Sequence, residues 1–269
     1  MGQEVQRCIA DSQDLILAGV WSRTDESDHL ISVLSSADIA IDFTLPEATS
    51  TVIQAACKAK TPLVCGVSGL PEPVYQLMAT AAKDIPILYD RNMSLGVAVL
   101  QQLVQMAGAA LANQIESEQI ESEHIGSDQF EGDQFEAEIH ETHHIHKLDA
   151  PSGTALQLGE ALAASRGQSF TEARHYDPCG KSHAAKGQIH FEVKRRGEVP
   201  GEHTVVFSSA NESLSLEHKV TDRRVFAAGA IRATCWLVEQ GPGLYGMQDV
   251  VKSGVGVKQS GVGVKYPVK

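Results

Sequence analysis

The sequence predicts an α/β protein in which a doubly wound parallel sheet is interrupted by an inserted α+β domain. Before Gly96, short apolar runs alternate with helical patterns, which is typical of βαβ units. After Gly96 strand-like patterns dominate, and an alanine-rich helical pattern returns near Asp222. These two changes indicate that the first domain is discontinuous and that the second is inserted within it.

The first part of the chain holds four apolar runs of strand length. They are Leu15–Val20, Ile39–Phe43, Pro62–Cys65 and Ile85–Tyr89. Helices are expected from Pro46 and from Pro71 or Pro73, because proline is favoured in the first turn and apolar residues follow at helical spacing. Glycine or polar residues follow the strands. In a doubly wound sheet these strand ends form the ligand crevice.

The later elements follow the same periodicities. Helices are expected at Val97–Ala112 and Asp222–Glu239, with strands between them at Gln188–Lys194, His203–Ser209 and Ser213–Val220. Near the end, the string SGVGVK occurs twice, and its glycine content predicts a flexible tail over residues 252–269.

Composition narrows the class of protein. With 42% apolar and 21% charged residues, the 269-residue chain is of ordinary globular type. No apolar run reaches the roughly 18 residues that span a bilayer, so we expect no membrane segment. Five cysteines without a C-x-x-C pair, and an N-terminus without an apolar signal core, predict a reduced, cytoplasmic protein.

The net charge of −12 is concentrated in one segment. Ten acidic residues and no Lys or Arg lie between Glu116 and Glu141, so the rest of the chain carries about −2. Two tandem duplications, at Gln114–Glu123 and Asp128–Ala137, supply most of this charge and predict a solvated loop or a frayed helical extension. The absence of basic patches argues against nucleic-acid binding.

The densest polar cluster lies between Glu138 and Ala155. It contains an H-E-x-x-H string, His140–His144, which suits zinc only if it is helical. Here the positions alternate with a period of two, which predicts a strand whose residues i and i+4 lie about 13 Å apart. We therefore expect no metal site. A polar strand with surface histidines remains the simpler alternative.

A helix start follows this strand. Asp149–Leu156 carries a polar cap, a proline in the first turn and then apolar residues at helical spacing. A helix N-terminus binds carboxylate or phosphate, Gly153 allows an anion to approach closely, and Thr154 adds a hydroxyl donor. Because Lys147 and three histidines precede it, the segment suits a small anionic substrate that needs proton transfer. A simple capped helix is the plainer interpretation.

The stretch Glu141–Leu156, ETHHIHKLDAPSGTAL, resembles the motif E-x-H-H-x-x-K-x-D-A-P-S-G-T-A of the 4-hydroxy-tetrahydrodipicolinate reductase (dihydrodipicolinate reductase) family. Further similar segments follow in the family's order. They are Asp42–Thr49, Gly66–Gly69, Asn92–Val97, Arg196–His203, Arg224–Ala230 and Gly243–Val250. The resemblance implies a Rossmann-like dinucleotide domain at residues 1–95 plus 226–251, and a substrate-binding and oligomerisation domain at 96–225.

The resemblance also implies a reaction, the NADPH- or NADH-dependent reduction of a cyclic imine dicarboxylate with loss of water, in lysine and diaminopimelate synthesis. It implies a homotetramer as well. His143 matches the family's catalytic proton donor or acceptor, and Lys147 its proton-donating lysine. His144, Gly153 and Thr154 match the substrate-carboxylate site. The residues that match cofactor contacts are Gly66, Val67, Ser68, Asp90, Arg91, Asn92 and Met93.

One expectation about geometry follows from these assignments. His143 and Lys147 would lie far apart on a straight strand, so the chain is expected to turn after His144 and bring them together.

The sequence departs from the family at two places near its start. The family opens with a strand and a glycine-rich loop that binds pyrophosphate, and Met1–Val5 resembles only the end of that motif. This leaves two hypotheses, an active reductase and a degenerate, non-catalytic relative that cannot bind a dinucleotide. Secondly, Ser22 and Arg23 stand where the family often has Glu-Arg. Because no carboxylate there repels a 2′-phosphate and Arg23 attracts it, we expect NADPH to be used at least as well as NADH.

Overall fold

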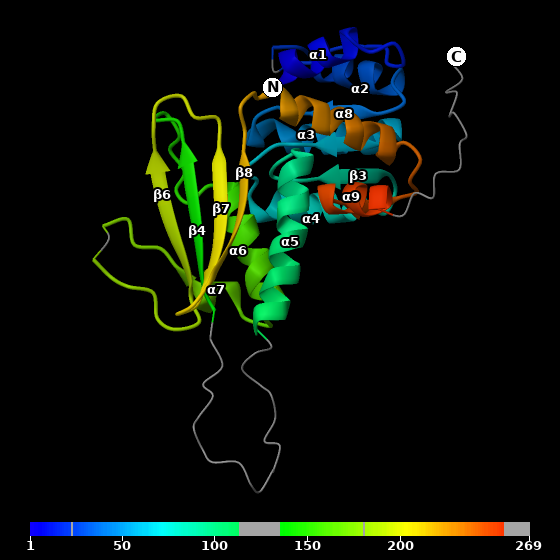
Figure 1. Cartoon of the computed structure of the whole chain (residues 1–269). Helices are drawn as coiled ribbons and strands as arrows, with labels where there is room; N and C mark the ends of the chain where they lie inside the picture. Colours follow the sequence, from blue (N-terminus) through cyan, green and yellow to red (C-terminus); the bar gives the residue numbers. More distant parts are fainter. Residues whose placement is uncertain (23, 113–134, 180, 256–269) are drawn as a thin grey trace, which may run out of the picture. The chain divides into compact units, whose positions relative to one another are not determined.

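The computed structural model describes residues 1–22, 24–112, 135–179 and 181–255 (Figure 1). Arg23, most of the acidic duplications and residues 256–269 lie outside this part of the chain. The described residues form two compact units. One comprises Met1–Ala98 and the chain from Arg223 onward, and the other lies within Val99–Asp222.

The first unit is built on a parallel sheet with the strand order β1-β2-β3-β9. Its strands are β1 (Ala40–Asp42), β2 (Leu63–Cys65), β3 (Pro86–Tyr89) and β9 (Gly243–Tyr245). Its helices are α1 (Gly2–Ala10), α2 (Ser27–Ser35), α3 (Pro46–Ala59), α4 (Glu72–Ala81), α8 (Arg224–Leu237) and α9 (Met247–Val255). The α/β class and the parallel sheet expected from the sequence are confirmed.

Side chains alternate across this sheet, and helices cover both of its faces. Leu63 and Ile87 pack with residues of α2, α3 and α4, whereas Val64 and Leu88 pack with residues of α8 and α9. This double covering explains why the strands are apolar throughout rather than alternating with polar residues.

The strand expected at Leu15–Val20 is wrong. The segment forms no ladder with any strand in the described part of the chain, and its side chains are largely exposed, Ile16 by 81%. Apolar composition cannot make a strand unless the backbone N–H and C=O groups find partners. The helices α1, α2, α7 and α9 were not predicted from the sequence. In α2, Leu30 and Leu34 are buried one turn apart, and the end of α9 makes Lys252–Val255 helical rather than part of a flexible tail.

The second unit holds a mixed sheet with the strand order β5-β6-β4-β7-β8. Its strands are β4 (Glu136–His143), β5 (Arg174–His175), β6 (Ile189–Arg195), β7 (Glu202–Ser208) and β8 (Ser213–Lys219). In Figure 1 the helix α6 (Gly153–Ser165) lies against one face of this sheet, with α7 (Phe170–Ala173) after it. The central strand β4 runs parallel to β6 and antiparallel to β7, so Glu141 lies opposite Val193 on one side and His203 on the other.

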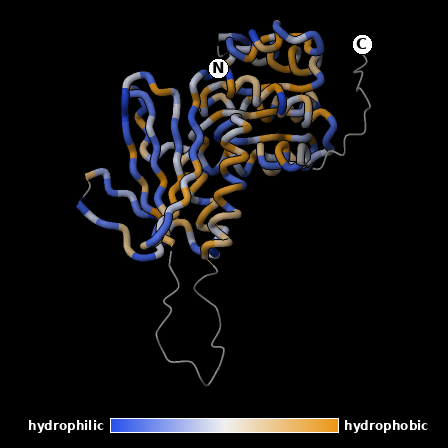
Figure 2. The backbone as a smooth tube through the Cα atoms, in the orientation of Figure 1, coloured by the Kyte–Doolittle hydropathy of each residue, from blue (hydrophilic) through white to orange (hydrophobic). Residues whose placement is uncertain are grey.

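The helix α5 (Leu95–Ala112) is long and apolar enough to cross a membrane by length and composition, and Figure 2 shows hydrophobic residues along it. Its Leu100 and Val104 belong to the buried core that includes Ile139 of β4 and Leu158 of α6. This packing accounts for the apolar residues on the inner side of α5, whereas Val99, Leu103 and Met106 are exposed.

Candidate functional site

The end of β4 places the two residues expected to carry proton transfer. The strand stops at His143, and the backbone N–H of Lys147 donates to the carbonyl of His144 at 3.2 Å. The predicted turn after His144 is therefore confirmed. Burial and, after it, the charge of Lys147 lower the pKa of His143.

Arg195 of β6 fastens this turn to the sheet. Its Nε donates to the carbonyl of Lys147 at 3.1 Å, and its Nη2 donates to the carbonyl of Asp149 at 2.6 Å. The Lys147 ammonium in turn donates to the Asp149 carboxylate at 2.8 Å. Burial raises the pKa of Asp149, but the hydrogen bond and charge of Lys147 outweigh it and hold that pKa below its usual value.

The carboxylate of Glu141 lies at the centre of the site, and its side chain is only 1% exposed. It accepts hydrogen bonds from the Ser152 N–H, at 3.2 Å to Oε1 and 3.0 Å to Oε2, and from Arg195 Nη1 at 3.3 Å. Two ring nitrogens lie just beyond hydrogen-bond distance of Oε2, His143 Nδ1 at 3.6 Å and His203 Nε2 at 3.9 Å.

Ser152 caps α6 at the point where Gly153 and Thr154 begin the helix. Its Oγ accepts from the N–H of Ala155 at 3.2 Å and lies 3.2 Å from His203 Nε2. The first amides of a helix have no acceptor within it and carry the positive end of the dipole. Gly153 and Thr154 therefore stand where an anion is favoured, and Thr154 is buried.

Burial dominates the charge state of both inner histidines. It lowers the pKa of His143 to about 4, assisted by the charges of Lys147 and Arg195. It lowers the pKa of His203 to about 3, assisted by His143. Both rings are thus neutral at neutral pH, and they contact each other edge to face at 5.0 Å between centroids.

A glycine from the β6–β7 connection closes one side of His143. A Cβ built on Gly201 would lie 3.2 Å from His143 Nε2 and 3.8 Å from His203 Cε1. Backbone rather than side chain therefore borders this edge of the ring.

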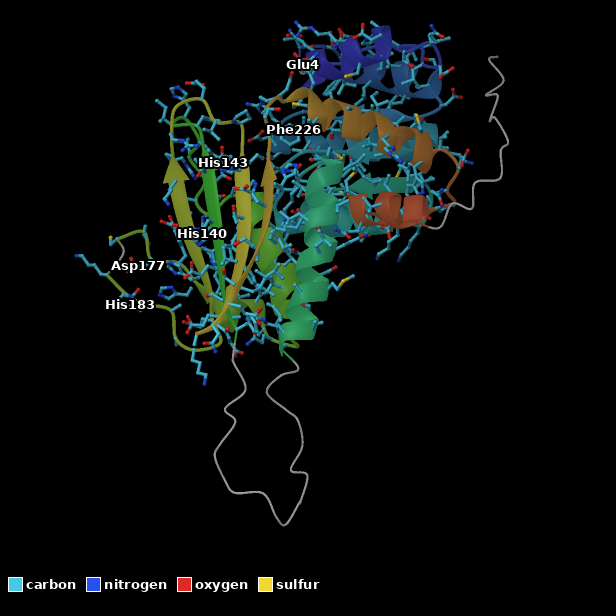
Figure 3. All side chains as sticks on the ribbon, viewed as in Figure 1. Glu4, His140, His143, Asp177, His183 and Phe226 are labelled. Atoms are coloured by element: carbon cyan, nitrogen blue, oxygen red, sulfur yellow. The ribbon has the colours of Figure 1, made fainter. Side chains whose placement is uncertain are left out.

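The H-E-x-x-H string is not a helical zinc motif, because residues 140–143 lie in β4 and His144 follows the end of that strand. Figure 3 labels His140 and His143 on this strand. On the outer face, His140 lies between the carboxylates of Glu138 at 2.7 Å and Glu192 at 2.8 Å.

Three other side chains offer ligand atoms close enough together to hold a metal ion. Ligand atoms of Glu141, His143 and His203 lie within 4.8 Å of one another. The Glu141 carboxylate, however, already accepts from Ser152 and from the Arg195 guanidinium, whose positive charge opposes a cation at this position.

Sequence reasoning missed four members of this cluster. Glu141 and Ser152 lie within the 141–156 motif without a separate role having been assigned to them, and His203 ends the similar segment Arg196–His203. Arg195, one residue before that segment, carried no signal of its own. His144, expected at the substrate carboxylate, lies half-buried on the turn after β4.

The residues expected to contact a cofactor follow β2 and β3 in the first unit, at the carboxyl ends of adjacent parallel strands. Ser68 is exposed, and Gly66, Arg91 and Asn92 are half-buried. Val67 and Met93 are buried, so only their backbone could reach a ligand. These hydroxyl, amide and guanidinium groups suit a dinucleotide.

Asp90 has a structural task at the same place. Its Oδ1 accepts from the N–H of Asn92 at 3.1 Å, and its Oδ2 accepts from the N–H of Met247, the first residue of α9, at 3.1 Å. The carboxylate therefore connects the end of β3 to the start of α9, and its oxygens already serve the backbone.

A doubly wound parallel sheet followed by an inserted α+β unit is the architecture of α/β proteins of the dinucleotide-binding class. The chain belongs to the dihydrodipicolinate reductase family. The family model for the N-terminus of dihydrodipicolinate reductase matches residues 1–93, and the model for its C-terminus matches residues 96–251.

Individual relatives agree. The chain is 42% identical over 220 residues to a 4-hydroxy-tetrahydrodipicolinate reductase of Pseudoalteromonas translucida (strain TAC 125), covering 81% of this chain and 74% of the relative. It is 36% identical over 256 residues to that of Zymomonas mobilis subsp. mobilis (strain ATCC 31821 / ZM4 / CP4), covering 93% and 92%. The dipicolinate-bound dihydrodipicolinate reductase from Paenisporosarcina sp. TG-14 has the same fold, with a TM-score of 0.67 and 18% identity over 92% of this chain and 94% of that one.

The two buried neutral histidines make stability depend on pH. In the unfolded chain they take up protons near pH 6.5, whereas in the folded chain His143 does so near 4 and His203 near 3. The unfolded state therefore binds more protons between these values, and folding stability falls as the pH drops from 7 towards 4. We expect a loss on the order of 1–2 kcal/mol per buried histidine between pH 7 and 5, measured by urea unfolding.

His203→Asn should flatten this pH dependence. The control is His183→Asn, because that side chain is exposed. An unchanged slope in His203→Asn would contradict the assignment.

Proposed function

We propose that the chain catalyses the reduction of 4-hydroxy-tetrahydrodipicolinate to tetrahydrodipicolinate and water with a nicotinamide dinucleotide. The carrying observation is one cluster of contacts in a member of this reductase family: the Glu141 carboxylate lies 3.6 Å from His143 and anchors the start of α6, and Arg195, which bonds to it, also holds the backbone of Lys147. The catalytic hypothesis is favoured over a degenerate relative because the chain belongs to the reductase family and retains His143, Lys147, Gly153 and Thr154 of the motif.

The first unit, residues 1–95 plus 226–251, would hold the dinucleotide, which supplies a hydride when bound. Gly66, Val67 and Ser68 after β2, and the segment Asp90–Met93 after β3, are the groups proposed to contact it. Residues 96–225 would bind the substrate.

The substrate's two carboxylates require fixed positive partners. We assign the binding of these carboxylates to the first turn of α6 at Gly153 and Thr154, and to His144 on the neighbouring turn. The helix dipole and the Thr154 hydroxyl are in place before the substrate arrives, because Ser152 and Glu141 hold the helix start. Preorganisation of this kind reduces the reorganisation needed at the reacting centre.

Proton transfer falls to Lys147 and His143. Loss of the substrate's hydroxyl group as water leaves a C=C bond conjugated with the C=N bond. A hydride added at the ring carbon that carried the hydroxyl group moves electron density towards nitrogen, and an acid within reach must supply the balancing proton, so that the C=N bond is present in the product. Lys147 carries the ammonium that can do so, and Arg195 holds its backbone in place. Neutral His143 can accept a proton, and a dianionic substrate beside it would favour the charged imidazolium.

Replacing Lys147 with Ala should lower kcat by roughly 10²- to 10⁴-fold, the usual cost of losing a positioned general acid. The circular dichroism spectrum should be unchanged, because the half-exposed side chain lies on a turn. The matched control is Lys186→Ala, an exposed lysine in the same unit. A kcat within about tenfold of the parent would remove Lys147 from the proposed role.

Cofactor choice involves the turn at Ser22. The Ser22 N–H donates to the Asp25 carboxylate at 2.6 Å and its Oγ does so at 3.0 Å, and these bonds lower the pKa of Asp25. A carboxylate is therefore supplied three residues after the place where the family often has one. We propose that NADPH is accepted at least as well as NADH, and that Asp25 moderates this preference by repelling a 2′-phosphate.

Replacing Asp25 with Asn should accordingly raise the ratio of kcat/KM for NADPH to that for NADH by about two- to fivefold, the size of an exposed charge interaction. Glu26→Gln removes a neighbouring exposed carboxylate and should leave the ratio unchanged. Equal ratios in the parent and in Asp25→Asn would show that Asp25 takes no part.

We further propose a homotetramer in the cytoplasm, assembled through the mixed sheet. The five cysteines form no disulfide, which suits a reducing compartment. The face of the sheet opposite α6 carries half-buried residues such as His140, Thr204 and Val206. Light scattering on the purified chain should give four times the mass of one chain, and a monomer would refute the assembly.

A further inference from the structure

We infer that Glu141 is a positioning residue for His143: its carboxylate selects the ring tautomer with the proton on Nδ1, so that Nε2 is the nitrogen that exchanges protons. This inference rests on the proposed function, because it concerns how the proton-transfer residue of that site is prepared.

The first observation is the isolation of Nδ1. His143 Nδ1 is buried and has no hydrogen-bond partner among the described residues. The nearest acidic oxygen is Glu141 Oε2 at 3.6 Å, slightly beyond hydrogen-bond distance. Catalytic hydrogen bonds are often long before the substrate binds and tighten afterwards. The Glu141 carboxylate is therefore placed to accept a hydrogen bond from a proton on Nδ1.

The second observation is that Glu141 is itself held rigidly. Two bonds from the Ser152 N–H and one from Arg195 fix its oxygens, so Oε2 cannot turn away from His143. Neighbouring strands supply these contacts, with Arg195 on β6 and His203 on β7. The charged or titratable groups that face His143 from the packed elements are Glu141, His144, Lys147, Asp149, Arg195 and His203.

The third observation is that the same carboxylate serves two parts of the site. Through Ser152 it holds the start of α6, where the substrate's carboxylate is proposed to bind, and through Oε2 it faces His143. A single rigid group therefore fixes the distance between the anion site and the proton-transfer ring.

The test uses Glu141→Gln in the full chain. With its oxygen at the Oε1 position the glutamine still accepts from the Ser152 N–H and from Arg195 Nη1. Its NH₂ group then replaces Oε2, which gives up the second bond from Ser152 and reverses the donor–acceptor relation towards His143. Long-range ¹⁵N–¹H correlation spectra, assigned with His143→Asn, report the tautomer directly. We expect the Nδ1–H tautomer in the parent and a shift towards Nε2–H in Glu141→Gln.

Turnover provides the second readout. In Glu141→Gln kcat should fall by about 10²-fold, whereas KM for the dicarboxylate should change by less than about threefold because the start of α6 stays anchored. Glu172→Gln, an exposed glutamate of α7, should leave both unchanged.

Several results would overturn the inference. They are an Nε2–H tautomer in the parent, or a folded Glu141→Gln protein with the parent's tautomer and a kcat within about threefold. If Glu141→Gln does not fold, the tautomer of His143 measured in the parent protein still tests the inference. If the parent shows no turnover, the proposed reaction fails while the spectra still test the role of Glu141.

Discussion

The second unit depends on how a buried carboxylate is compensated. Removing Glu141 from water costs several kcal/mol unless its charge and lone pairs are satisfied. A guanidinium and a backbone amide provide that compensation, from residues 54 and 11 positions away in the chain. Once these two partners are in place, the positions of β4, β6, the turn that bears Lys147 and the start of α6 are fixed relative to one another. Because an unpaired buried carboxylate would destabilise the folded chain, the contacts that set the geometry of the site must form when the chain folds.

Arg195 extends this compensation to the turn that bears Lys147. One planar group bonds to a carboxylate and to the carbonyls on either side of Leu148, an arrangement that the fork of donors on arginine allows and the ammonium of lysine does not. The turn needs such a clamp because its own side chains contribute little burial, and Leu148 is 96% exposed. Rigid backbone under an exposed surface suits a residue that must meet a substrate in a defined position.

Much of this arrangement was predictable, and the rest was not for identifiable reasons. Alternation along Glu136–His143 predicted β4 and excluded a helical zinc motif, because period two is a local property of the chain. The polar and apolar pattern of Asp149–Leu156 predicted α6 for the same reason, although the helix begins only at Gly153 with Ser152 as its cap, so Pro151 precedes the helix instead of lying in its first turn. The roles of Glu141 and Arg195 depend on a contact across two strands, which no local pattern reveals. Leu15–Val20 shows the converse failure, because strand formation needs a partner that composition does not supply.

The glycine beside His143 limits how this enzyme could change. The space next to the ring's Nε2 ends at the backbone of Gly201, and even the methyl group of alanine would press on the imidazole. A protein under selection to exclude a tight inhibitor usually fills the space around it with a larger side chain. At this position a larger side chain would displace His143, the proposed proton-transfer residue, so an inhibitor that contacts His143 along this edge would meet a surface that cannot be filled without moving the ring.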